Sequence, residues 1–206
     1  AGRKLATIGS PAQYNGIGLA PDNRHAVAAL HDDSQGSDNL WTIDLDRGVQ
    51  SRVTAGPQHD QNPVVSPDGA SVVFSSDRSG PGDLYRKRTN GLGDEELLVK
   101  SELVKAPRDW SAHWIVFAVN TPQRGSDLWV LSTEANAKPR PYLQTEFNED
   151  HGRLSPDEHW MAYDSDEAGS SQIYIRPFPD ANAGKWQIST VEGSRPRWQS
   201  DGKGLF

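Results

Sequence analysis

The sequence of 206 residues contains no cysteine and only one methionine. The absence of cysteine excludes disulfide bonds, cysteine-ligated zinc and thiol catalysis. No stretch approaches the roughly 18 consecutive apolar residues of a membrane-spanning helix, so we expect no membrane insertion by this chain. The first residues also lack the apolar run of a signal peptide.

Basic residues are in the minority, with 21 Lys and Arg against 28 Asp and Glu and a net charge of −7. An acidic domain repels phosphate backbones, so nucleic acid is not an expected partner. The sequence has no Gly-x-Ser-x-Gly elbow, no His-Glu-x-x-His pair and no phosphate-binding loop. We therefore expect a protein that is not an enzyme and that carries no cofactor.

The sequence does contain an internal repeat, marked by Pro-Asp turns. Weaker copies of the turn follow the same spacing, and taking Pro21, Pro67, Ala112, Pro156 and Ser200 as equivalent gives steps of 46, 45, 44 and 44 residues. A second landmark repeats independently with steps of 44, 44 and 45, an aromatic residue at Trp41, Tyr85, Trp129 and Tyr174. Two landmarks with one period indicate a repeat architecture.

Each repeat contains four short runs rich in β-branched residues, separated by Gly, Pro, Asn and Asp. Four antiparallel strands per 44–46 residues are typical of a β-propeller blade, whereas a β-sandwich requires no such period. We predict an all-β, single-domain propeller over residues 1–206. Its blade units are 11–56, 57–102, 103–146 and 147–192, with a partial unit at 193–206.

The partial unit raises the question of how the propeller closes. We expect a fragment of a longer propeller of six or more blades. A small five-bladed ring is the alternative, in which residues 1–10 pair with 193–206. Self-association of incomplete rings is a further possibility, because open sheet edges invite pairing.

The motifs resemble a known family. The run Ser66-Pro67-Asp68-Gly69, followed by residues 75–80 and by Asp83-Leu84-Tyr85, resembles the TolB-type repeat of WD-repeat-like propellers. Residues 173–179 and 184–189 are similar to propellers attached to bacterial transmembrane serine/threonine kinases. This resemblance covers residues 11–206. It implies a protein-binding sensor or scaffold part of a larger bacterial protein, in an extracytoplasmic or periplasmic location.

The resemblance also leaves two enzymatic alternatives open. TolB-type propellers occur in peptidases and polysaccharide lyases. The chain could therefore be the gating propeller of a prolyl-oligopeptidase-like peptidase, or a metal-dependent lyase-like propeller. Either role needs a hydrolase domain or a convergent histidine cluster that this sequence does not display.

The first strand of each unit should carry the binding site. The residue before each turn is large and apolar, which predicts core positions at Leu19, Val65, Trp110, Leu154 and Trp198. The positions before it in each first strand differ between units, and many of them are charged. Residues that vary on a repeating scaffold are candidates for a binding site. The candidate contacts for a protein or small-molecule ligand are His59, Asp60, Arg108, Asp109, Asp150, His151, Arg153, Arg195 and Arg197. The alternative is that these charges pair with one another and are merely solvated.

Two further groups have simpler interpretations. His59 and His151 are placed on equivalent loops with carboxylates nearby, which is acceptable chemistry for a divalent metal. Their units are not adjacent, however, so no metal ligands are predicted. The recurring aromatics at 41, 85, 129 and 174 should pack between blades, with a ligand-stacking platform as the alternative.

Overall fold

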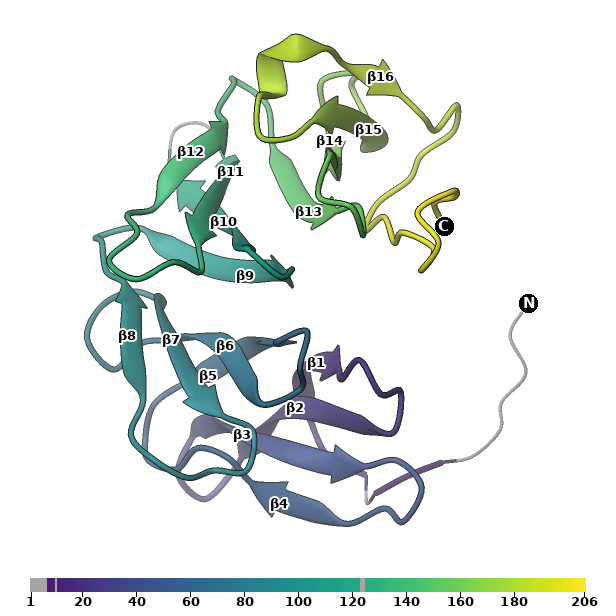
Figure 1. The fold of residues 1–206 in the computed structure, drawn as a ribbon. Helices are drawn as coiled ribbons and strands as arrows, with labels where there is room; N and C mark the ends of the chain where they lie inside the picture. Colours follow the sequence, from purple (N-terminus) through teal and green to yellow (C-terminus); the bar gives the residue numbers. More distant parts are fainter. Residues whose placement is uncertain (1–6, 10, 123–124) are drawn as a thin grey trace. The chain divides into compact units, whose positions relative to one another are not determined.

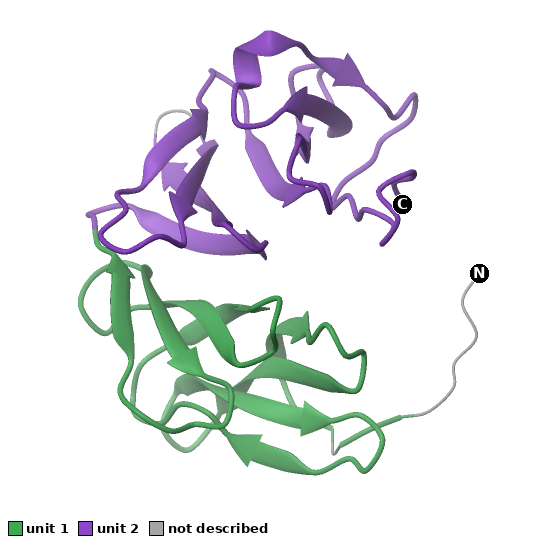
Figure 2. Ribbon diagram, in the orientation of Figure 1, with its two compact units in different colours: residues 1–100 green, residues 101–206 purple. Residues whose placement is uncertain are grey.

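The computed structural model describes residues 7–9, 11–122 and 125–206. The chain divides into two compact units, Ala1–Lys100 and Ser101–Phe206 (Figure 2). Each unit holds two four-stranded antiparallel sheets in which neighbouring strands follow one another along the chain (Figure 1). Within the described residues, the one helical element is a 3₁₀ turn at Ala181–Ala183. The predicted all-β class with four strands per repeat is confirmed.

The first unit contains two sheets. The first sheet comprises β1 (Tyr14–Leu19), β2 (His25–Asp32), β3 (Ser37–Asp44) and β4 (Gln50–Arg52). The second comprises β5 (Asp60–Val65), β6 (Ser71–Ser76), β7 (Asp83–Arg88) and β8 (Glu96–Val99). A hydrophobic cluster between them joins Val27 and Leu40 of the first sheet to Phe74 and Tyr85 of the second.

The second unit repeats this plan. Its first sheet comprises β9 (Val104–Trp110), β10 (Trp114–Thr121), β11 (Gly125–Ser132) and β12 (Arg140–Leu143). Its second comprises β13 (Glu149–Leu154), β14 (Trp160–Ser165), β15 (Gln172–Pro177) and β16 (Trp186–Gln187). Leu128 and Val130 pack against Met161, Tyr163 and Tyr174 in its core. Tyr85 and Tyr174 therefore pack between sheets, as predicted for the recurring aromatics, whereas Trp41 and Trp129 are only half-buried and belong to neither cluster.

The Pro-Asp turns form as their chemistry requires. The Ser66 hydroxyl and the Ala70 N–H donate to the carboxylate of Asp68, at 2.5 and 2.9 Å. Gly69 closes this turn with φ at +74°, a conformation that glycine adopts without steric cost. In the second unit Asp157 accepts the corresponding bonds from Ser155 and His159.

The core prediction for the last residue of each first strand holds only in part. Val65 and Leu154 are buried, as expected. Leu19 is 56% exposed, however, and Trp110 and Trp198 are only half-buried. The prediction failed at Leu19 because hydrophobicity alone does not reveal whether a neighbouring sheet covers that face.

A backbone irregularity recurs in the first strands. The pairing of β5 with β6 shifts between Gln61 and Val64, and the pairing of β13 with β14 shifts between Asp150 and Arg153. Inside these bulges, Asn62 and His151 have φ values of +53° and +51°. Arg195, at the same repeat position, has a φ of +57°. We call these three left-handed residues the bulge positions.

The last described residues form a hairpin. Arg197 and Phe206 exchange two backbone hydrogen bonds, of 3.2 and 2.9 Å, and form a short hairpin that closes through residues 199–204. The expected strand pairing of residues 1–10 falls largely on residues 1–6 and 10, which lie outside the described residues.

Candidate functional site

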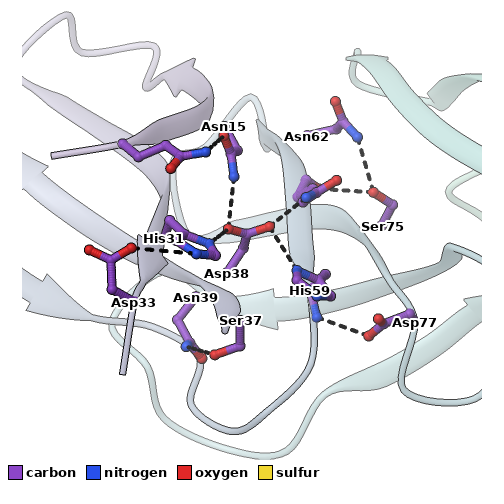
Figure 3. A network of polar contacts seen from close by, with 12 residues as sticks. Asn15, His31, Asp33, Ser37, Asp38, Asn39, His59, Asn62, Ser75 and Asp77 are labelled. Atoms are coloured by element: carbon purple, nitrogen blue, oxygen red, sulfur yellow. Dashed lines mark hydrogen bonds and ion pairs between the residues drawn. The ribbon is translucent and has the colours of Figure 1, made fainter. Parts of the chain in front are cut away.

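A buried carboxylate, Asp38, organises the polar residues of the first unit (Figure 3). Its side chain is 2% exposed and lies at the start of β3. One oxygen accepts hydrogen bonds from Asn15 and from Nδ1 of His31, both at 2.8 Å. The other accepts from Nδ1 of His59 at 3.0 Å and from the amide of Gln61 at 2.5 Å. Four donors from three strands and a loop therefore converge on one acceptor.

This arrangement determines the charge state of Asp38. Burial alone would raise the pKa of a carboxyl group, because it penalises the charged form. Hydrogen bonds from Gln61, His59, His31 and Asn15 outweigh burial and lower the pKa of Asp38 to about 2. In return, the hydrogen bond to Asp38 raises the pKa of His59 above its usual value. Asp38 is thus a fixed negative charge at neutral pH.

Asp60, one of the predicted contact residues, is not accessible. It is 0% exposed, and both of its oxygens accept from Arg78 at 2.8 Å. Arg78 also pairs with Glu95 at 2.8 Å and stacks over the rings of Phe74 and Tyr85. These contacts hold Asp60 in the interior. They correct the prediction that Asp60 contacts a ligand, because its role is structural.

In the second unit, most of the predicted residues meet in ion pairs. Arg108 binds Asp150 through two hydrogen bonds, of 2.5 and 2.8 Å. Asp109 accepts from Arg153 at 3.3 Å and from the backbone N–H of Leu154 at 2.8 Å. The interpretation that arginine and aspartate pair with one another therefore holds for these four side chains.

Arg195 and Arg197 differ from the other arginines. Both are exposed, and within the described residues neither guanidinium contacts a carboxylate. The Arg197 guanidinium donates only to the carbonyl of Pro196, at 3.1 Å, and the backbone N–H of Arg195 donates to Asp164 at 3.3 Å. Although Arg197 is exposed as a residue, partial desolvation of its guanidinium and the nearby positive charges of Arg153 and Arg195 lower its pKa, against the opposing charge of Asp109. A ligand anion placed here would relieve that repulsion.

The two singled-out histidines do not occupy equivalent places. His151 lies within β13 at a bulge position, and its Nδ1 is 3.0 Å from Asp164. Its counterpart in the first unit is Asn62, whereas the counterpart of His59 is Asn148. Backbone contacts confirm this alignment, because the N–H groups of His59 and Asn148 each donate to an aspartate, at 2.9 Å. The two loops, 59–62 and 148–151, are therefore equivalent as expected from the sequence, with His59 at the first position of one and His151 at the last position of the other.

The described chain contains neither a metal centre nor a membrane-spanning helix. Among residues 7–9, 11–122 and 125–206, no group of three or more histidine, aspartate or glutamate side chains is arranged to hold a metal ion. The same residues include no helix long and apolar enough to cross a membrane.

Sequence reasoning missed Asn15, His31, Asp38 and Asp164 as parts of polar networks. The sequence did offer a signal for Asp38, because it is a carboxylate at a repeat position where the second unit has the neutral Ser126. His31 and Asn15 carried none, since neither departs from a conspicuous motif.

Comparisons with known proteins support the fold. No family model matches the chain. The uncharacterized protein Atu1656 of Agrobacterium fabrum is 32% identical over 75 residues, which are 36% of this chain and 24% of that protein. The chain thus spans about a quarter of the length of this curated relative.

Solved structures give a wider match. A structure described as a TolB protein of Agrobacterium tumefaciens superposes with a TM-score of 0.81 at 18% identity, over 95% of this chain and 69% of that one. TolB of Acinetobacter baumannii gives 0.71 at 14% identity, over 94% and 48% of the two chains. Prolyl oligopeptidase B of Galerina marginata gives 0.69 at 9% identity, over 95% and 30%. The chain therefore has a TolB-like β-propeller fold.

Proposed function

We propose that this chain is a non-catalytic recognition module that binds a protein or small ligand through its first strands. The observation that carries the proposal is the recurrence of a left-handed residue at one repeat position, occupied by Asn62, His151 and Arg195. A left-handed L-residue costs on the order of 1–2 kcal/mol, and such strain collects at functional sites. Three different side chains at one strained position are what a variable recognition surface requires.

The charges indicate which ligand this surface favours. Arg108 and Arg153 are neutralised by Asp150 and Asp109, but Arg195 and Arg197 retain unneutralised positive charge. Arginine presents several donors in a planar fork that matches a carboxylate. We therefore propose an anionic ligand, such as an acidic peptide segment, for this part of the second unit.

The larger context of the module is also part of the proposal. The resemblance to kinase-attached propellers supports a sensor or scaffold role in a larger bacterial protein, outside the cytoplasm. The gating role in a peptidase stays a hypothesis raised by the sequence. Sequencing the parent reading frame separates the two, because the first requires a neighbouring kinase and the second a neighbouring hydrolase.

Peptide binding tests the module directly. Fluorescence anisotropy of labelled peptides of about ten glutamates or about ten lysines would be followed against protein concentration. We expect the glutamate peptide to bind, the lysine peptide not to bind, and binding to weaken as salt is added. The double substitution Arg195→Ala/Arg197→Ala should weaken binding at least about tenfold, since each charge-assisted hydrogen bond contributes about 1.5–3 kcal/mol.

A matched control distinguishes binding at a specific site from a general effect of positive charge. Arg24→Ala/Arg47→Ala removes the same charge from exposed arginines that are paired with Asp46 and Asp44. This control should leave the affinity close to that of the wild type. Equal losses in the two double variants would contradict the proposal.

A further inference from the structure

The two sheets of the first unit are joined by a titratable contact at the Asp38 cluster (Figure 3). Asp38 lies in the first sheet, whereas His59 and Gln61 belong to the segment that begins the second. The backbone N–H of Asp38 donates to the carbonyl of Gln58 at 3.2 Å, and Asp38 forms a parallel bridge with His59. We call this group of contacts the seam.

The second unit contains the corresponding contact with neutral residues at both positions. There Ser126 stands in place of Asp38, and Asn148 stands in place of His59. The backbone N–H of Ser126 donates to the side-chain oxygen of Asn148 at 3.2 Å. One chain thus holds a neutral and an ionisable version of one contact, and the neutral version shows that the fold does not require the ionisable residues.

The charges around the seam favour a protonated histidine. The side chain of His59 is 43% exposed, so it can exchange protons with solvent, whereas Asp38 is buried. His59 faces Asp38, and its pKa is also raised by the charges of Asp77 and Asp60, the latter paired with Arg78. His31 shares Asp38 and has Nε2 3.8 Å from Asp33. Two imidazoles therefore share one buried negative charge, each at its own oxygen.

We infer that the seam is a pH-sensitive latch, closed by the imidazolium of His59 on Asp38 and loosened when His59 loses its proton. The raised pKa of His59 fixes the sign. The stabilisation is fully present below the unfolded-state pKa of 6.5 and is lost as the pH rises through the folded-state pKa. A loosened seam releases the contact between Asp38 and the loop before β5, whereas Asp60 at the start of β5 stays bound to Arg78.

Histidine titration by NMR of the whole chain is the first test. We expect His59 to titrate above 6.5 in the wild type and to move downward in Asp38→Asn. Titration of His59 at or below 6.5 in the folded wild type would overturn the inference. If Asp38→Asn fails to fold, the wild-type titration and the His59 variant below still decide the question.

Hydrogen exchange at the seam is the second test. The protection of the Asp38 amide, corrected for the intrinsic rate, should fall in the wild type as pH rises from about 6 to about 8. A difference of one pKa unit corresponds to an about tenfold change in the opening constant. His59→Asn, which copies the residue of the second unit, should abolish this dependence.

His25→Asn is the matched control, because His25 pairs at 2.6 Å with Asp22 in the turn between β1 and β2 and not across the seam. It should keep the pH dependence of the wild type. If His59→Asn retained that dependence, or if His25→Asn lost it equally, the latch would be refuted.

Discussion

Glu149 offers a sharp test of the interior electrostatics. This residue begins β13 and is buried, with Thr145 donating a hydrogen bond to one oxygen. The other oxygen has no hydrogen-bond partner within the described chain. Burial raises the pKa of Glu149 to about 7 from its ordinary 4.5, and the charges of Asp127 and Glu167 add to the shift.

The first unit shows what is missing at Glu149. Asp60 occupies the same repeat position and is neutralised by Arg78. In the second unit the place of Arg78 is taken by Glu167, an acid paired with Lys185. Among the described residues, the buried carboxyl of Glu149 therefore lacks the cation that its counterpart has, and its protonated form is favoured up to about pH 7.

The magnitude follows from the two pKa values. A group whose pKa is raised by folding stabilises the fold below its unfolded-state pKa, and this contribution disappears as pH rises through the folded-state pKa. The interval from 4.5 to about 7 corresponds to a loss of about 3 kcal/mol from the free energy of unfolding by about pH 8. Glu149→Gln removes the ionisation and should be more stable than the wild type at high pH by up to this amount.

Urea unfolding followed by circular dichroism, at about pH 4.5 and about pH 8, measures the difference. The variant and the wild type should differ little at the lower pH and clearly at the higher one. The inference about Glu149 would be refuted if their stabilities changed in parallel with pH. Because the raised pKa of His59 adds a pH dependence of its own, the comparison is between variants at each pH and not between pH values for one protein.

Three further predictions test the packing. Arg78→Ala leaves Asp60 charged and buried, so the free energy of unfolding in urea should fall by about 3–5 kcal/mol. Arg24→Ala removes an exposed ion pair and should lower it by under about 1 kcal/mol. Similar losses in the two variants would contradict this reasoning. A Cβ at Gly18 would lie 2.5 Å from the carbonyl oxygen of Pro63, so Gly18→Ala should cost about 1–3 kcal/mol in thermal unfolding. Gly16→Ala, whose Cβ would have its nearest neighbours in Pro63 Cδ at 3.2 Å and the backbone N of Asn62 at 3.4 Å, should cost less. The reverse order would exclude the close contact as the cause.

Much of the fold could be predicted because its signals are local. The Pro-Asp turns and the β-branched runs act over four to six residues, and the repeat period averages out errors in any one unit. The bulge positions could not be predicted from the same information. A left-handed Asn62 or His151 depends on how its strand pairs with the next one, and the sequence does not show this register.

The candidate site was predicted less well because charge states depend on partners. Asp60 and Asp150 look alike in the sequence, yet one is fully buried and the other half-buried. The partner of Asp60 is Arg78, which lies beyond the next strand. The partner of Asp150 is Arg108, from the preceding sheet. Residue type indicated that charge gathers in the first strands, but only the structure shows which charges remain unneutralised.

The bulge positions have a consequence for how such a module changes over time. The extra residue of a bulge is taken up locally, so strand pairing on either side stays in register. Asparagine, aspartate, histidine and glycine tolerate a left-handed backbone, whereas β-branched residues do not. Single substitutions at positions 62 and 151 therefore change a half-buried side chain while the strand pairing on either side stays in register. Such a scaffold can diverge toward new ligands one mutation at a time without passing through unfolded intermediates.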